Sequence, residues 1–187
     1  MVNMINEKVQ LILDEIKFVL KGVDDSETEK FILEILSANR IVVCGAGRVG
    51  MAIRGFAMRL GHFGFNAYTL GDSTVPGIKN NDLLIVASGS GETQTIFDLV
   101  SIASKNDCRI VAITGNINSR IAKLSNIVVK ITAPSKVKSV DGFVSIQPMT
   151  TLNEQCLGLF FDAICLKIMD KTGETHESMW ERHSNLE

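Results

Sequence analysis

The sequence predicts an α/β fold in which helices flank a doubly wound, five-stranded parallel sheet. Five short runs rich in β-branched residues follow one another along the chain, separated by segments long enough for helices. These runs are almost continuously apolar, which is typical of strands buried on both faces of a sheet. Strands that alternate with helices indicate a parallel sheet covered on both sides.

The length of 187 residues fits one domain, residues 1–187, with a single sizeable core. Apolar residues make up 45% of the chain and charged residues 21%, without any low-complexity stretch. This composition favours an ordinary globular protein over a disordered one. We expect N-terminal helices over residues 1–37, and a C-terminal helix and tail over residues 150–187.

The N-terminal region is expected to form two helices. Ser26 and Glu29 match an S-x-x-E capping box at the start of the second. Leu11 and Phe18 lie off the main apolar stripe of the first helix, so a second covered face, such as another subunit, would bury them. That main stripe recurs at three- and four-residue steps and consists of Ile5, Val9, Ile12, Ile16 and Val19.

The alternating region contains the five expected strands and two clear crossover helices. Residues 48–61 and 93–104 carry apolar side chains on one helical face each. The strands are "RIVVC", "NAYTL", "LLIVA", "RIVAIT" and "NIVVKI", at residues 40–44, 66–70, 83–87, 109–114 and 126–131.

The last part of the chain begins with a long loop over residues 133–150, which contains prolines and has weak periodicity. A strong helix follows and ends at "KTGET", before a short tail. Leu157, Phe161, Ile164 and Ile168 have helical spacing in it.

Charge and targeting signals exclude several classes of protein. The net charge is −2 and the basic residues are scattered, which argues against nucleic acid as a partner. The opening residues lack a basic n-region and an apolar h-region, and no apolar run approaches about 18 residues. We therefore expect a cytoplasmic protein that does not bind a membrane.

The four cysteines lie in or beside apolar stretches without a C-x-x-C pair, so they are interpreted as small buried hydrophobic residues. They are Cys44, Cys108, Cys156 and Cys165. The sequence also shows no His/Asp/Glu cluster with ligand spacing, so we expect no metal.

Two glycine clusters follow expected strands, at the edge where parallel sheets bind ligands. The first, "GAGRVG", is a G-x-G-x-x-G motif from Gly45 to Gly50, and Asp72 follows at the interval of a ribose-binding acid. A nicotinamide site is therefore one interpretation. Two features argue against it: the chain is short for separate dinucleotide and substrate domains, and Asp72 lies in a glycine-containing loop.

The second cluster, "SGSGET", carries hydroxyl groups on Ser88, Ser90 and Thr93 among Gly89 and Gly91. These hydroxyls and the loop N–H groups can converge on a phosphate monoester. No G-K-[ST] follows, which excludes a Walker P-loop. A serine-glycine turn with an ordinary helix cap is the alternative.

Taken together, "GAGRVG", "SGSGET", "QPMTTLNEQ" and "RHSNLE" resemble the sugar isomerase (SIS) domain family, from about residue 41 to residue 187. The segments "FAMRLGHFGFNA", "IQPM" and "RHSNLE" resemble its hexulose-6-phosphate isomerase members. The resemblance implies a flavodoxin-like three-layer sandwich. It also implies conversion of D-arabino-hex-3-ulose 6-phosphate to fructose 6-phosphate through a cis-enediol(ate), without a cofactor, in formaldehyde fixation by the ribulose monophosphate pathway.

The same resemblance assigns roles to three charged or titratable residues. Glu154 matches the glutamate that moves the proton, although Thr151 and Glu154 also form a T-x-x-E capping pattern. Arg48 would stabilise enediolate charge or grip hydroxyls, unless it makes an ordinary surface ion pair. His183 would reach the active site of a neighbouring subunit.

The expected substrate- and phosphate-binding residues are Gly45, Gly47, Ser88, Gly89, Ser90, Gly91, Glu92 and Thr93. Glu92 is a secondary candidate because an acid at a helix start is favoured by the dipole in any case. His62 is either structural or a further participant. Gln147 and Pro148 are expected at the rim of the pocket, and Trp180 is expected to pack the tail onto a neighbour.

Several functions and partners remain open at this stage. The alternatives are a non-catalytic sugar-phosphate sensor, an aldose-ketose isomerase for another sugar phosphate, and a nicotinamide oxidoreductase. As an isomerase, the protein is expected to form a homo-oligomer, a tetramer by resemblance, with functional coupling to a hexulose-6-phosphate synthase.

Overall fold

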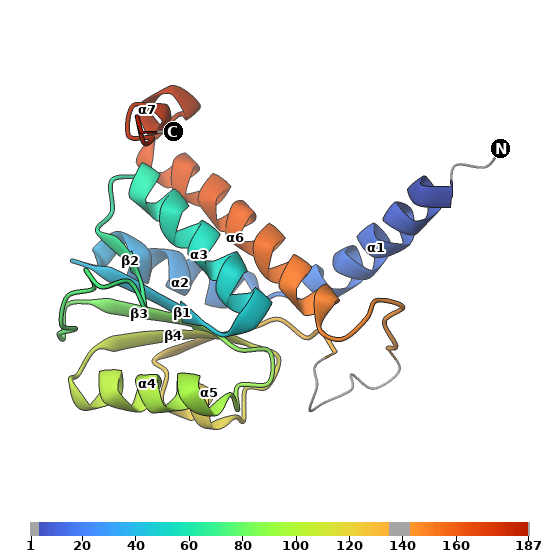
Figure 1. Cartoon of the computed structure of the whole chain (residues 1–187), viewed down its shortest axis with the longest axis horizontal. Helices are drawn as coiled ribbons and strands as arrows, with labels where there is room; N and C mark the ends of the chain where they lie inside the picture. Colours follow the sequence, from blue (N-terminus) through green and yellow to red (C-terminus); the bar gives the residue numbers. More distant parts are fainter. Residues whose placement is uncertain (1–3, 135–142, 187) are drawn as a thin grey trace.

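A computed structural model describes residues 4–134 and 143–186 and contains a five-stranded parallel sheet (Figure 1). The strands lie in the order β2-β1-β3-β4-β5, and each neighbouring pair is parallel. They are β1 (Ile41–Gly45), β2 (Ala67–Thr69), β3 (Leu83–Ala87), β4 (Arg109–Thr114) and β5 (Ile127–Lys130). The fold class is confirmed, and each strand starts within one residue of its expected position.

The strand order reverses at β1, because the chain passes to β2 on one side and then crosses back to β3 on the other. In open α/β sheets, ligands bind beyond the carboxyl ends of the strands at such a reversal. Both glycine clusters follow the strands that flank it, so the topology brings them to one edge.

Helices cover both faces of the sheet (Figure 1). One face is covered by α2 (Asp25–Ser37), α3 (Gly47–His62) and α6 (Thr151–Thr172), and the end of α1 (Met4–Leu20) packs on α6 at the edge of this core. The other packs against α4 (Gln94–Lys105) and α5 (Arg120–Lys123). Successive strand residues point to opposite faces, so Val43 enters the first core and Val42 the second.

Helix α1 extends away from the rest of the molecule (Figure 1). Only Ile16 and Val19 of this helix are buried, whereas the Phe18 side chain is 60% exposed. Phe18 stacks on Phe143 with ring centroids 4.7 Å apart. The apolar surface expected on this helix is therefore present, and its burial by another subunit stays a prediction.

Two local features differ from the sequence predictions. The S-x-x-E box at Ser26 is wrong: Asp24 caps α2, and its carboxylate accepts a hydrogen bond from the Glu27 N–H at 2.9 Å. An Asp side chain reaches this N–H directly, so the helix begins two residues earlier than expected. The tail contains a short helix, α7 (His176–Trp180), that the sequence did not predict. The one-turn helix α5 was also not predicted, because four residues are too few to show a helical period.

The cysteines are buried, as the sequence indicated. Burial raises the pKa of Cys44 and Cys108 to about 11 and that of Cys156 and Cys165 to about 12. Among residues 4–134 and 143–186, no helix is both long and apolar enough to cross a bilayer. Part of the long loop expected over residues 133–150 lies outside the described residues, as do the first three residues and the last one.

Candidate functional site

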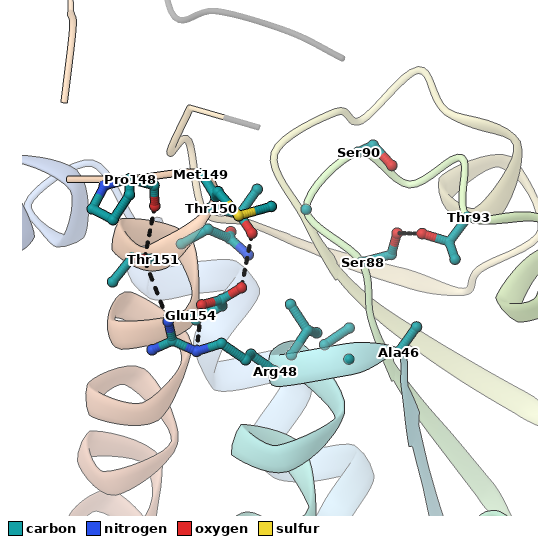
Figure 2. A pocket seen from close by; sticks show the side chains of 15 residues that line it. Ala46, Arg48, Ser88, Ser90, Thr93, Pro148, Met149, Thr150, Thr151 and Glu154 are labelled. Atoms are coloured by element: carbon teal, nitrogen blue, oxygen red, sulfur yellow. Dashed lines mark hydrogen bonds and ion pairs between the residues drawn. The ribbon is translucent and has the colours of Figure 1, made fainter. Parts of the chain in front are cut away.

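A cavity of about 510 Å³ opens at the carboxyl ends of β1 and β3 (Figure 2). Helices α3 and α6 begin at this cavity, and Thr93, the residue before α4, lines it. Helix N-termini present free N–H groups and a positive dipole end, which favours an anionic ligand. The lining consists of residues 46–49, 87–90 and 148–151, with Thr93, Asn153 and Glu154.

The first glycine loop brings the end of β1 and the start of α3 into close contact. A Cβ atom on Gly50 would lie 2.5 Å from the Gly45 carbonyl oxygen, so only glycine fits there. Gly47 has a φ of +58°, a left-handed conformation that glycine adopts without strain. Gly47 and Arg48 line the cavity, whereas Gly45 supports the loop from behind.

The second loop presents Ser88, Ser90 and Thr93 to the cavity (Figure 2). The Ser88 and Thr93 hydroxyl oxygens lie 3.0 Å apart, and Ser90 Oγ accepts a hydrogen bond from the Glu92 N–H at 3.1 Å. Thr93 stands at the N-cap of α4, but its side chain makes no capping hydrogen bond. Helix capping therefore does not explain why a hydroxyl occupies this position, and the Ser88–Thr93 pair remains available to a ligand.

Gly91 keeps the second loop close to the neighbouring turn. Its φ is +66°, and a Cβ atom there would lie 2.0 Å from Ser119 Oγ. Gly91 does not line the cavity, whereas Gly89 does. The two glycines thus have different roles: Gly91 supports the loop, and Gly89 leaves room for the Asn153 side chain.

Glu154 meets Arg48 at the opposite wall of the cavity (Figure 2). Its Oε2 lies 2.9 Å from Arg48 Nε, and its Oε1 accepts a hydrogen bond from Thr150 Oγ1 at 2.8 Å. The carboxylate does not reach a backbone N–H, and Thr151 instead donates its hydroxyl to the Pro148 carbonyl at 2.8 Å. The T-x-x-E capping alternative is therefore wrong for Glu154.

The two oxygens of Glu154 are held differently. Oε2 is buried and, although it pairs with Arg48 by distance, no N–H is aligned with it for a hydrogen bond. The Arg48 side chain is 58% exposed, so it can move without disrupting packing. A carboxylate oxygen with an open lone pair beside a mobile cation is suited to accept a proton from a bound molecule.

Glu92 and His183 lie away from this cavity within the described chain. The Glu92 carboxylate lies 2.6 Å from Arg120 Nε, and hydrogen bonds from the Arg120 side chain and backbone lower the Glu92 pKa. His183 stacks on Trp180 at 4.8 Å and lies beside His62 at 5.2 Å. These rings line a second cavity, of about 500 Å³, at the far ends of α3 and α6.

Sequence reasoning missed Thr150, Asn153 and Glu15. The first two belong to the "TTLNEQ" segment and line the cavity. Their closeness to Glu154 in the sequence could have identified them as site residues. No sequence signal identified Glu15 of α1, because its hydrogen-bond partners lie about 130 residues further along the chain. Its carboxylate accepts hydrogen bonds from the Ser145 hydroxyl, the Ile146 N–H and the Gln147 side chain, at 2.8, 2.7 and 2.9 Å.

Two bacterial proteins with similar sequences carry the same name. The chain is 38% identical over 181 residues to the 3-hexulose-6-phosphate isomerase of Bacillus subtilis, covering 97% of this chain and 98% of that protein. It is 37% identical to the Mycobacterium gastri protein of the same name, covering 98% of this chain and 92% of the relative.

Solved structures agree at the level of the fold. A Methanococcus jannaschii protein, whose crystal structure infers a function of 3-hexulose-6-phosphate isomerase, matches with a TM-score of 0.84 and 27% identity. The match covers 97% of this chain and 99% of that one. The SIS domain model matches residues 34–157, which include both glycine loops and Glu154. The chain therefore belongs to the SIS domain family.

Proposed function

We propose that the protein is a 6-phospho-3-hexuloisomerase, which converts D-arabino-hex-3-ulose 6-phosphate into fructose 6-phosphate. One observation carries this proposal: a single cavity places the hydroxyl-bearing loop opposite a carboxylate that is not used for helix capping. The names of the two bacterial relatives support this choice of substrate.

In the proposed complex, the phosphate group binds the second loop. Ser88, Ser90 and Thr93 supply hydroxyl donors, and the start of α4 supplies a favourable dipole. A C3 ketone cannot close a five-membered ring through the C6 oxygen, because phosphate occupies that oxygen. The substrate therefore enters in its open-chain form, and the forward reaction needs no ring-opening acid.

Glu154 then removes the proton from C2, and the electron pair forms the C2–C3 double bond while the C3 carbonyl becomes an enediolate oxygen. The C3 oxygen takes up a proton as the C2 hydroxyl releases one, Glu154 returns its proton to C3, and the carbonyl is left at C2. Arg48 lies close enough to the carboxylate to stabilise the negative charge of this intermediate. Oxidation states only exchange within the sugar, so the chemistry balances without an external oxidant or reductant.

The proposal includes the finer expectations from the sequence. These are a homotetramer, His183 contributed to a neighbouring subunit, a cytoplasmic location, and a role beside a hexulose-6-phosphate synthase in the ribulose monophosphate pathway. The exposed apolar side chains of α1, including Phe18, support an oligomer because isolated subunits rarely leave such a surface uncovered.

The decisive test supplies purified protein with hex-3-ulose 6-phosphate, generated from formaldehyde and ribulose 5-phosphate by a hexulose-6-phosphate synthase. We expect fructose 6-phosphate to appear. Arabinose 5-phosphate serves as a control for an aldose-ketose isomerase, and NAD(H) titration tests the oxidoreductase alternative. Binding of fructose 6-phosphate without turnover would instead identify a sensor.

A further inference from the structure

The Asn153 carboxamide is the most deeply buried polar group in the cavity wall that the proposed chemistry does not use. Asn153 lies in the first turn of α6, directly before Glu154, and only 3% of the residue is exposed. It lines the cavity together with Gly89 of the second loop. Its place is therefore between the phosphate-binding loop and the carboxylate that moves the proton.

Gly89 shows how the carboxamide is oriented. A Cβ atom placed on Gly89 would lie 3.1, 3.3 and 3.4 Å from Asn153 Nδ2, Cγ and Oδ1. These similar distances mean that the flat amide group lies with its face against the Gly89 backbone. Its donor and acceptor edges are then free to face elsewhere, and a side chain at position 89 would press on the amide.

The carboxamide makes no hydrogen bond with any residue in the described ranges 4–134 and 143–186. Polar groups this far from bulk solvent are normally satisfied by a protein group, a water or a ligand, so the carboxamide has a partner in the functional state. Among the other lining residues, the Ser88 and Thr93 hydroxyls are assigned to the phosphate group, and the open Oε2 of Glu154 is assigned to proton removal. Besides Glu154 Oε2, the Asn153 carboxamide is therefore the buried polar side chain of this wall that has a ligand as its natural partner.

The chemistry of an amide selects the kind of partner. A carboxamide offers both an N–H donor and a carbonyl acceptor, which together match a hydroxyl group. A phosphate dianion only accepts hydrogen bonds, so it would leave the carbonyl oxygen unpaired.

We propose that Asn153 binds a hydroxyl group on the carbon chain of the sugar phosphate, and so distinguishes a hydroxylated substrate from a bare phosphate. This inference rests on the proposed function in one respect, that the ligand is a sugar phosphate. It adds a binding residue to the site and places the sugar chain between the second loop and Glu154.

The test compares two ligands without requiring turnover. Fructose 6-phosphate and inorganic phosphate are titrated calorimetrically into the wild-type protein and into Asn153→Leu, which keeps a similar volume and removes both polar groups. We expect the Kd for fructose 6-phosphate to rise about 10- to 100-fold and the Kd for inorganic phosphate to change less than about threefold. Asn118→Leu is the matched control, because Asn118 is an exposed asparagine at the same sheet edge and does not line the cavity.

Equal weakening of both ligands, or no weakening of either, would overturn the inference. Thermal unfolding identifies a variant that has lost its fold, in which case Asn153→Ala is titrated under the same criterion. Failure of the proposed function is a separate result: wild-type protein would then bind fructose 6-phosphate without isomerising it. A wild-type isomerase whose Asn153→Leu variant binds both ligands normally would refute this inference alone.

Discussion

The two glycine loops have similar sequences and lie at the same edge of the sheet, but their glycines and polar residues serve different purposes. In residues 45–50, glycine allows a strand and a helix to touch, and the loop supplies one charged side chain, Arg48, which pairs with Glu154. In residues 88–93, the loop supplies hydroxyl groups of its own. The comparison teaches that a glycine motif identifies a tight strand-helix turn, and that the side chains between the glycines decide its chemistry.

If this division is correct, changes on the Arg48–Glu154 side will mainly lower turnover, and changes in the second loop will mainly weaken phosphate binding. The largest effect is expected for Glu154→Gln, which keeps the shape of the side chain and removes the base. We expect kcat to fall about 10²- to 10⁴-fold. Steady-state kinetics and a fructose 6-phosphate titration measure the two effects separately.

Glu7→Gln, on the exposed surface of α1, is the matched control for loss of a carboxylate. It should retain normal kcat. A Glu154→Gln variant with near-normal kcat would remove this residue from the mechanism, and a large loss of ligand binding would show that its role is not limited to proton transfer.

The second loop is tested by Thr93→Val, which removes one hydroxyl at constant shape. We expect the Kd for inorganic phosphate to rise about tenfold, since a hydrogen bond to a charged group contributes about 1.5–3 kcal/mol. At saturating substrate, kcat should change less than about threefold. Thr95→Val provides the control, because Thr95 is exposed two residues later and does not line the cavity. A fall in kcat with unchanged phosphate affinity would reverse the proposed division of roles.

The glycines themselves are compared by making the same substitution in each loop. Gly47→Ala should lower the free energy of unfolding by about 1–2 kcal/mol, because its left-handed backbone disfavours a side chain although space is available. Gly91→Ala should cost about 2–5 kcal/mol, because the same strain is combined with overlap against Ser119. Urea denaturation measures both values. Equal losses would mean that the contact with Ser119 relaxes easily.

The smallest expected effect concerns Glu15, which anchors the segment leading to the cavity rim from outside both loops. Burial raises its pKa, but the hydrogen bonds from Gln147, Ile146 and Ser145 outweigh burial and lower the pKa below its ordinary value of 4.5. The unfolded chain therefore binds a proton more readily, so this contribution to stability is present above pH 4.5 and is lost as pH falls through the folded pKa.

Glu15→Gln should accordingly flatten the pH dependence of the unfolding free energy below about pH 4.5, as measured by denaturation between pH 3 and pH 7. Glu7→Gln again serves as the control, since Glu7 makes no such contact. An unchanged pH profile for Glu15→Gln would show that the three hydrogen bonds do not persist in solution.

Much of the fold could be predicted because its signals are local. Each strand is a short apolar run whose position does not depend on its neighbours, and α3 and α4 carry apolar residues at helical spacing. Helix starts were less predictable, since Asp24 and Ser26 are both good caps and only the backbone conformation decides between them. The short helices α5 and α7 contain too few turns to show a period.

By itself, the sequence determined the alternating pattern, the two glycine turns and the hydroxyl groups within the second one, because each depends on residues that are neighbours in the chain. Only the tertiary structure decided that Arg48 meets Glu154, that Glu15 holds the segment before the cavity rim, and that Asn153 lies against Gly89. These contacts join distant segments, and they form because the strand order reverses at β1 and helices α3 and α6 pack side by side. Local sequence patterns do not encode such pairings.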